Sequence, residues 1–177
     1  MKVVLFFFFL IGLFAVGIFN YDVAASRPHG KVVSALMHEF LESSVRREAR
    51  SVVMGDLNPI SRPEAAEHYR YMCESCHGAP GSENPPLSKG LYPPPPKLHV
   101  NESEWSEGEL FWIIKHGIKF TGMPGFGSDH SDAELWGLAT FVKELNDLSA
   151  EDYTGFFSAE TAPAKGGSSH DHHGHHH

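Results

Sequence analysis

Five consecutive residues constrain the fold of this chain more than any others: Cys73, Glu74, Ser75, Cys76 and His77. On one turn of helix, the two thiols can reach the two vinyl groups of a haem and form thioethers, and the adjacent imidazole can then bind the iron. The chain has no other cysteine, which excludes a disulfide framework and a four-thiolate metal site. The motif therefore predicts one covalent haem c.

Other interpretations of a cysteine pair with this spacing need features that the rest of the chain does not offer. A thioredoxin-like redox pair lies in a βαβ context, and the sequence predicts none. A zinc site needs two further ligands at suitable spacing, and there is no second C-x-x-C. Because so short a motif also occurs by chance, the flanking sequence has to support it.

The flanking sequence predicts helices around the motif. One begins near Pro63, with Ser61 or Arg62 as its cap, and runs through residue 72 into the motif. A second is expected from the capping box of Ser106 and Glu109 to a stop at Gly117, and a third from the capping box of Ser131 and Glu134 to about Asn146. The third helix should cross the first near Ala65 and Tyr69. No useful alternation of apolar residues occurs, so the prediction is an all-α fold of three to five helices.

Met123 is the strongest candidate for the second iron ligand. It stands between a glycine and a proline, which favours a loop in which the thioether can point at a fixed target. Methionine is more often a core filler, but these neighbours argue against a helix-core position. Met72 adjoins the motif on the wrong side, and the other three methionines precede the predicted domain. His99 and His116 remain rival ligands.

The loop from residue 78 to 98 is rich in proline, including the run Pro93 to Pro96. Such a run is extended and stiff, so it either forms a strap over the haem edge or serves as a linker or a ligand for a proline-binding domain. A histidine that binds a metal usually donates its second N–H to a carbonyl or carboxylate. Pro85 or Pro86 is the expected carbonyl for His77.

The N-terminus is apolar from residue 3 to 19 and is preceded by Lys2. It is either a cleaved signal peptide, with residues 23–25 as the cleavage site, or a membrane anchor. We favour the anchor, with Lys2 left in the cytoplasm and the rest of the chain exported. Exported chains are the ones that receive haem c.

Residues 27–53 carry apolar side chains at helical spacing and arginines near the end. They predict a helix that packs on the haem domain as a linker or, as a less favoured alternative, lies on the membrane surface. The chain is thus divided into an anchor or signal peptide (1–25), a helical linker (26–58), a haem domain (59–150) and a disordered His-rich tail (151–177).

The net charge of the chain and the histidines at its C-terminal end indicate which partners the protein could bind. The net charge of the chain is −8, which argues against nucleic acid. Residues 59–150 hold seven Lys and Arg against 13 Asp and Glu, a net charge of −6. Such a domain is expected to dock on a basic patch of a redox protein, or simply to be well solvated. The last eight residues hold six histidines, which could bind zinc, copper or nickel unless they are a purification tag.

The chain resembles class I cytochromes c over residues 60–147. The resemblance rests on the helix that carries Cys73 to Gly78, on the loop Gly122-Met123-Pro124 and on the C-terminal helix with Leu135-Trp136, in this order. The stretch 108–117 is similar to bacterial members near the third subunit of cbb3-type oxidases. The resemblance implies a cytochrome c fold around one haem, with Cys73 and Cys76 as the attachment residues and His77 and Met123 as axial ligands of its iron.

The implied function is electron transport without catalysis by the chain itself, either as a free carrier or as a subunit of a larger oxidoreductase. The protein would lie in the inner membrane with its haem domain in the periplasm, or be soluble in the periplasm if the N-terminus is cleaved. The alternative function is a haem or metal sensor or scavenger, with a displaceable methionine ligand and the His-rich tail as the working part.

Overall fold

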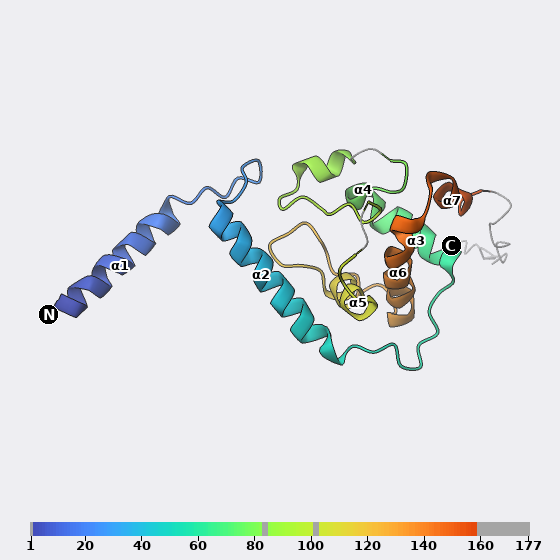
Figure 1. Cartoon of the computed structure of the whole chain (residues 1–177), viewed down its shortest axis with the longest axis horizontal. Helices are drawn as coiled ribbons and strands as arrows, with labels where there is room; N and C mark the ends of the chain where they lie inside the picture. The colour runs from blue at the N-terminus through green and yellow to red at the C-terminus, as the bar shows by residue number, and fades with distance from the viewer. Residues whose placement is uncertain (1, 83–84, 101–102, 159–177) are drawn as a thin grey trace, which may run out of the picture.

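The computed structural model describes residues 2–82, 85–100 and 103–158, and within these residues it is helical without a strand (Figure 1). This confirms the predicted all-α fold. The α-helices are α1 (Lys2–Phe19), α2 (Lys31–Glu48), α3 (Arg62–Met72), α4 (Glu74–His77), α5 (Glu107–His116), α6 (Asp132–Glu144) and α7 (Ala150–Gly155). Three short 3₁₀ helices lie between the described α-helices: η1 (Ala49–Ser51), η2 (Pro86–Gly90) and η3 (Leu145–Asp147).

The core lies between α3, α5 and α6. Helix α6 packs against both of the others, and its inward side chains are buried because they recur at helical spacing along one broad face. Tyr69 of α3 is fully buried, and its ring centroid lies 5.8 Å from that of Phe141 on α6. The predicted crossing of these two helices near Ala65 and Tyr69 is confirmed, since Ala65 is also buried in this contact layer.

Serine capping boxes start α3, α5, α6 and α7. At α3 the Ser61 backbone N–H donates to the Glu64 carboxylate at 2.9 Å, so Ser61 rather than Arg62 is the cap. The boxes predicted at Ser106 and Ser131 are both present. Helix α6 ends at Glu144, two residues before the expected end, and the chain continues as η3.

Helix α7 corrects the predicted start of the disordered tail at residue 151. Its Tyr153 is 4% exposed, and the ring packs edge-on against Tyr69 at 6.2 Å between centroids. Phe156 likewise packs against Phe141 at 5.8 Å. These aromatic side chains close one side of the core, which is why the chain stays ordered there. The histidine-rich end of the tail lies outside the described residues.

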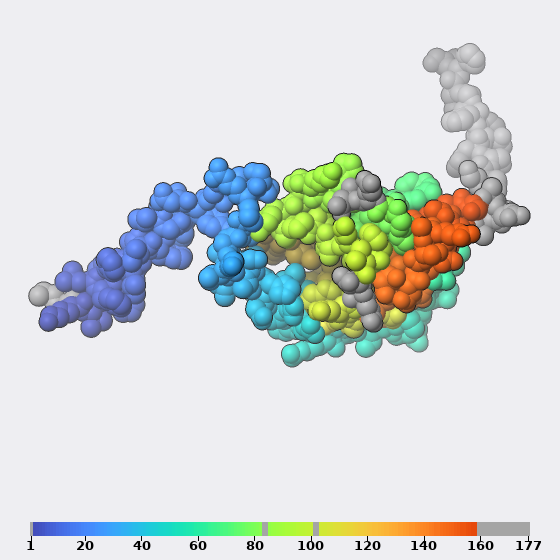
Figure 2. Space-filling model, turned by 45° about the horizontal axis from the view of Figure 1, so that its top comes forward, coloured from blue at the N-terminus to red at the C-terminus, as the bar shows by residue number. Residues whose placement is uncertain are grey.

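The two N-terminal helices differ in how they relate to the domain. Helix α1 has no buried residue and projects away from the rest of the molecule (Figure 2). It is long and apolar enough to cross a membrane, as an anchor or a signal sequence would be. Helix α2 instead packs on α5, where Val45 is 1% exposed. It occupies the segment expected to be a linker.

Candidate haem site

The attachment motif forms a tight turn at the end of α3. Cys73 is the C-cap residue of α3, and its N–H donates to the Tyr69 carbonyl at 2.9 Å. The Cys73 carbonyl then accepts from the N–H groups of Cys76 at 3.0 Å and His77 at 2.8 Å. This turn places two thiols and an imidazole on one short helix. Both thiols are free, and burial raises the pKa of Cys73 to about 12, so it stays protonated at neutral pH.

The His77 imidazole is oriented by the proline-rich loop. Its Nδ1 lies 2.8 Å from the Pro96 carbonyl oxygen, and since a carbonyl only accepts, Nδ1 carries the proton in this bond. Nε2 has no hydrogen bond among the described residues and stays available as a metal ligand. Burial lowers the pKa of His77, which favours the neutral ring that metals bind.

The expectation that Pro85 or Pro86 would supply this carbonyl is wrong. The Pro85 carbonyl accepts instead from the backbone N–H of Ser88 at 3.1 Å and from its hydroxyl at 2.7 Å. These bonds form the start of η2, so the carbonyl is already engaged locally. The chain returns to His77 only at the end of the proline run.

A buried tyrosine fixes the residue that follows the motif. The Tyr69 hydroxyl donates to the Gly78 carbonyl at 2.6 Å, and the pKa of this phenol is raised by burial. Gly78 has a φ of +73°, which favours glycine, and a Cβ here would lie 3.0 Å from Cε1 of His99. The backbone next to His77 is therefore held from α3 on one side and packed against His99 on the other.

The methionine loop is tied to the C-terminal end of α5. The Met123 carbonyl accepts from the Ile118 N–H at 3.1 Å, and the Met123 N–H donates to the Thr121 hydroxyl at 3.1 Å. Further along, the N–H of Phe126 donates to the Ile114 carbonyl at 3.0 Å. The loop thus satisfies carbonyls that the end of a helix leaves without partners.

Two close contacts leave the methionine loop little freedom to move. A Cβ on Gly117, the residue that ends α5, would lie 2.7 Å from the Met123 carbonyl oxygen. A Cβ on Gly122 would lie 2.7 Å from Cδ2 of Leu91. The second contact joins the methionine loop to the segment that leads into Pro96, so the loop carrying Met123 and the loop orienting His77 touch.

The rival ligands lie in different surroundings. His116 is exposed on α5, with its ring centroid 5.0 Å from that of Trp112. His99 lies against Gly78, and its Nδ1 atom is buried without a partner.

The sequence offered no signal for the hydrogen bonds that Tyr69 and Pro96 make at the site, because both bonds depend on contacts made only after folding.

Comparison with known proteins assigns the centre of the chain. Residues 62–142, from the start of α3 through most of α6, match the family model described as "Cytochrome C oxidase, cbb3-type, subunit III". The match supports a class I cytochrome c-like domain in this segment. The match leaves α1, α2 and α7 outside it. Neither the curated proteins nor the solved structures gave a match.

A cytochrome c-like domain implies covalently bound haem c, and the residues present fit that group. The motif supplies two free thiols three positions apart and an imidazole with one nitrogen unengaged. Buried polar atoms are nearly always hydrogen-bonded. The Nδ1 atom of His99, beside the motif, is buried without a hydrogen-bond partner, and a polar group at the edge of a bound haem would supply one.

Proposed function

We propose that the protein is a membrane-tethered, single-haem electron carrier of the periplasm, with Cys73 and Cys76 as attachment residues and His77 and Met123 as axial ligands. The observation that carries the proposal is the contact between the two loops. The loop that orients His77 touches the loop that holds Met123. The proposal is supported by the bond of the His77 ring to the Pro96 carbonyl and by the bonds of the Met123 backbone with Ile118 and Thr121.

A haem held by Cys73, Cys76, His77 and Met123 would supply one-electron redox chemistry. The protein's own part is to hold both axial positions. With His77 and Met123 in place no coordination position stays open, which favours electron transfer over catalysis at the iron. The pairing of histidine with methionine also raises the reduction potential.

The partner would be a redox protein that presents a basic patch. Residues 59–150 carry a net charge of −6, and opposite charges speed the encounter between proteins in a way that salt weakens. The tether of α1 would raise the local concentration of membrane partners without any new contact. Electron transfer to such a partner should therefore slow as ionic strength increases.

The experiment that tests the axial ligands is the visible spectrum of the exported protein with Met123→Ala. The wild type should show the haem c spectrum and the weak charge-transfer band of methionine-ligated ferric haem, and the variant should lose that band but keep the covalent haem. Met54→Ala is the matched control, since Met54 lies in the linker before α3 and is 43% exposed.

A wild-type spectrum without this band would contradict the assignment and point to His99 or His116, and an unchanged band in Met123→Ala would contradict it in favour of another methionine. Rapid binding of carbon monoxide by the wild-type reduced protein would contradict the carrier and favour the sensor or scavenger.

The tether is tested by the mass of the mature protein. An intact N-terminus supports the anchor, whereas a chain that begins at Ser26 would show that α1 is a cleaved signal peptide and that the carrier is soluble.

A further inference from the structure

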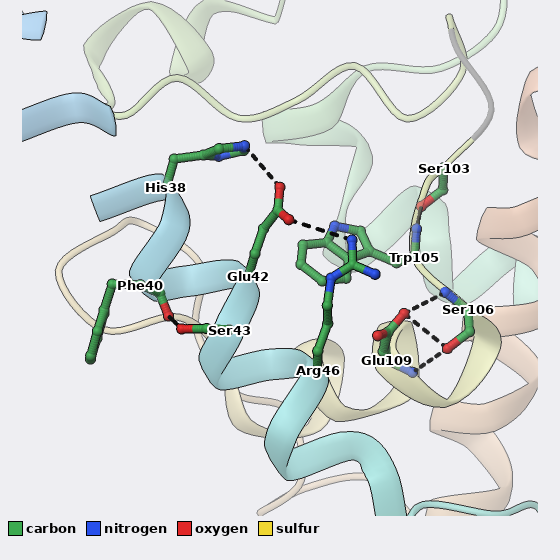
Figure 3. Close-up of polar contacts among 9 residues, drawn as sticks. All are labelled: His38, Phe40, Glu42, Ser43, Arg46, Ser103, Trp105, Ser106 and Glu109. Atoms are coloured by element: carbon green, nitrogen blue, oxygen red, sulfur yellow. Dashed lines mark hydrogen bonds and ion pairs between the residues drawn. The ribbon is translucent and has the colours of Figure 1, made fainter. Parts of the chain in front are cut away.

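Helix α2 is attached to the haem domain along one side only. Val45 and Ala49 are buried against the domain. The Arg46 guanidinium lies 5.4 Å from the centroid of the Trp105 ring and 3.4 Å from the Glu42 carboxylate (Figure 3). A cation over an aromatic face is attractive, so this side of α2 is a built contact and the helix is held to the domain.

The other side of α2 is apolar and uncovered in its first half. Val32 is 73% exposed, and Leu36 and Phe40 are each 65% exposed. These residues are four positions apart, so they share one face of the helix. Figure 3 shows Phe40 on the side of the helix away from Trp105. Further along the same face the residues are polar, with Ser43 and Arg47.

The apolar face starts close to the membrane-spanning candidate. Only residues 20–30 separate α1 from α2. That link is held to the domain, because the His29 N–H donates to the Tyr92 hydroxyl at 2.9 Å and the two rings pack edge-on at 4.8 Å. Where α1 ends in a bilayer, the first half of α2 must therefore lie near the bilayer surface.

We infer that the outward face of α2 lies in the membrane interface, with Val32, Leu36 and Phe40 among the lipid chains. This inference rests on the tether of the proposed function and adds a second membrane contact. An interfacial helix buries its apolar face at the boundary of headgroups and chains and keeps its polar side away from it. The change from apolar to polar residues along α2 fits a helix that enters the interface at its N-terminal end.

A lipid surface suits this face better than a protein partner does. The large apolar side chains that α2 exposes all lie between Val32 and Phe40, whereas beyond Phe40 its exposed residues are polar or charged. Lys31, the first residue of α2, is exposed, so its ammonium group can reach phosphate headgroups at the interface. The consequence is a haem domain held at a fixed height and orientation above the bilayer, because α2 is docked on that domain.

A spin label tests the inference. The only two native cysteines are those of the attachment motif, so in the haem-loaded full chain an introduced cysteine is the single free thiol. Leu36→Cys places a nitroxide on the apolar face. Ser34→Cys is the matched control, because it is exposed and lies about 200° around the helix from position 36. Both proteins are reconstituted in vesicles of phosphatidylethanolamine and phosphatidylglycerol.

Collisions with dissolved oxygen report a lipid environment, and collisions with a water-soluble nickel chelate report water. We expect the ratio of oxygen to nickel collisions to be several-fold higher for Leu36→Cys than for Ser34→Cys. Equal, water-like ratios at both positions would overturn the inference. A label at position 36 that is shielded from both reagents and broadened by a second label would also overturn it, in favour of a second copy of the chain.

Phe40→Cys repeats the measurement one turn along, in case the first variant folds poorly, and should give the same high ratio. The outcome is separable from that of the proposed function. The haem spectrum and the mass of the N-terminus decide the carrier and its tether. If α1 proves to be cleaved, adding the labelled mature protein to the same vesicles still shows whether the face of α2 enters lipid.

Discussion

Replacing Tyr69 by phenylalanine should destabilise the haem domain through a single lost hydrogen bond. The ring is fully buried, and its hydroxyl donates to the Gly78 carbonyl at 2.6 Å. Phenylalanine keeps the ring and its contact with Phe141, so the packing of α3 on α6 is preserved. What changes is that the Gly78 carbonyl, in a buried residue, loses its donor.

The size of the effect follows from the burial of that carbonyl. A buried acceptor left without a partner costs about 1–3 kcal/mol, whereas an exposed one would cost little. We take ~2 kcal/mol as the expected loss in the free energy of unfolding. For a domain of up to about 100 residues, each kcal/mol lowers the melting temperature by about 4–8 °C. The variant should therefore melt about 8–16 °C below the wild type.

The assay is thermal unfolding of the haem-loaded protein, followed by circular dichroism and by the haem absorbance. Tyr71→Phe is the matched control, because Tyr71 is on the same helix, is 76% exposed, and has no hydroxyl hydrogen bond among the described residues. The control should stay within ~0.5 kcal/mol of the wild type. Equal melting temperatures for the two variants would refute the role assigned to the Tyr69 hydroxyl.

Three further predictions test other contacts. In chemical unfolding, Gly81→Ala should lower the free energy of unfolding by ~1–3 kcal/mol more than Gly55→Ala does. Both glycines have positive φ, so the backbone strain is shared, but only at Gly81 would a Cβ lie 2.5 Å from the Cβ of Ala150, the first residue of α7. Gly117→Ala should weaken the methionine-ligation band without loss of covalent haem, since its Cβ would displace the Met123 loop. Burial, with the bond to Glu74, raises the pKa of Tyr153. The protonated Tyr153 hydroxyl contributes its full share to the free energy of unfolding below the unfolded pKa of ~10, and that share falls by up to ~1.4 kcal/mol per pH unit above it. In chemical unfolding measured as a function of pH, Tyr153→Phe should therefore lose less stability above pH ~10 than the wild type does.

Local sequence patterns were sufficient for the features that act over a few residues. A serine followed by glutamate three positions later satisfies the first N–H groups of a helix whatever the rest of the chain does. The boxes at Ser106 and Ser131 therefore started helices where they were predicted. The cysteine motif likewise carries its own spacing, which is why the haem-type domain was recognisable before any tertiary contact was known.

Features that join distant segments could not be predicted in this way. The carbonyl opposite His77 belongs to Pro96, 19 positions away, because η2 engages the nearer Pro85 carbonyl locally. The hydroxyl of Tyr153 donates to Glu74 at 2.7 Å across 79 positions, which holds α7 on the domain although residues 151–177 were predicted to be a tail.

The sequence by itself thus determined the helical class, the starts of α5 and α6 and the chemistry of the attachment turn, since each depends on neighbours a few residues apart. Only the tertiary structure decided that the loops of His77 and Met123 touch and that one apolar face of α2 stays uncovered. The physical reason is that burial and hydrogen-bond partners depend on where the chain returns to itself, and no local spacing encodes that path.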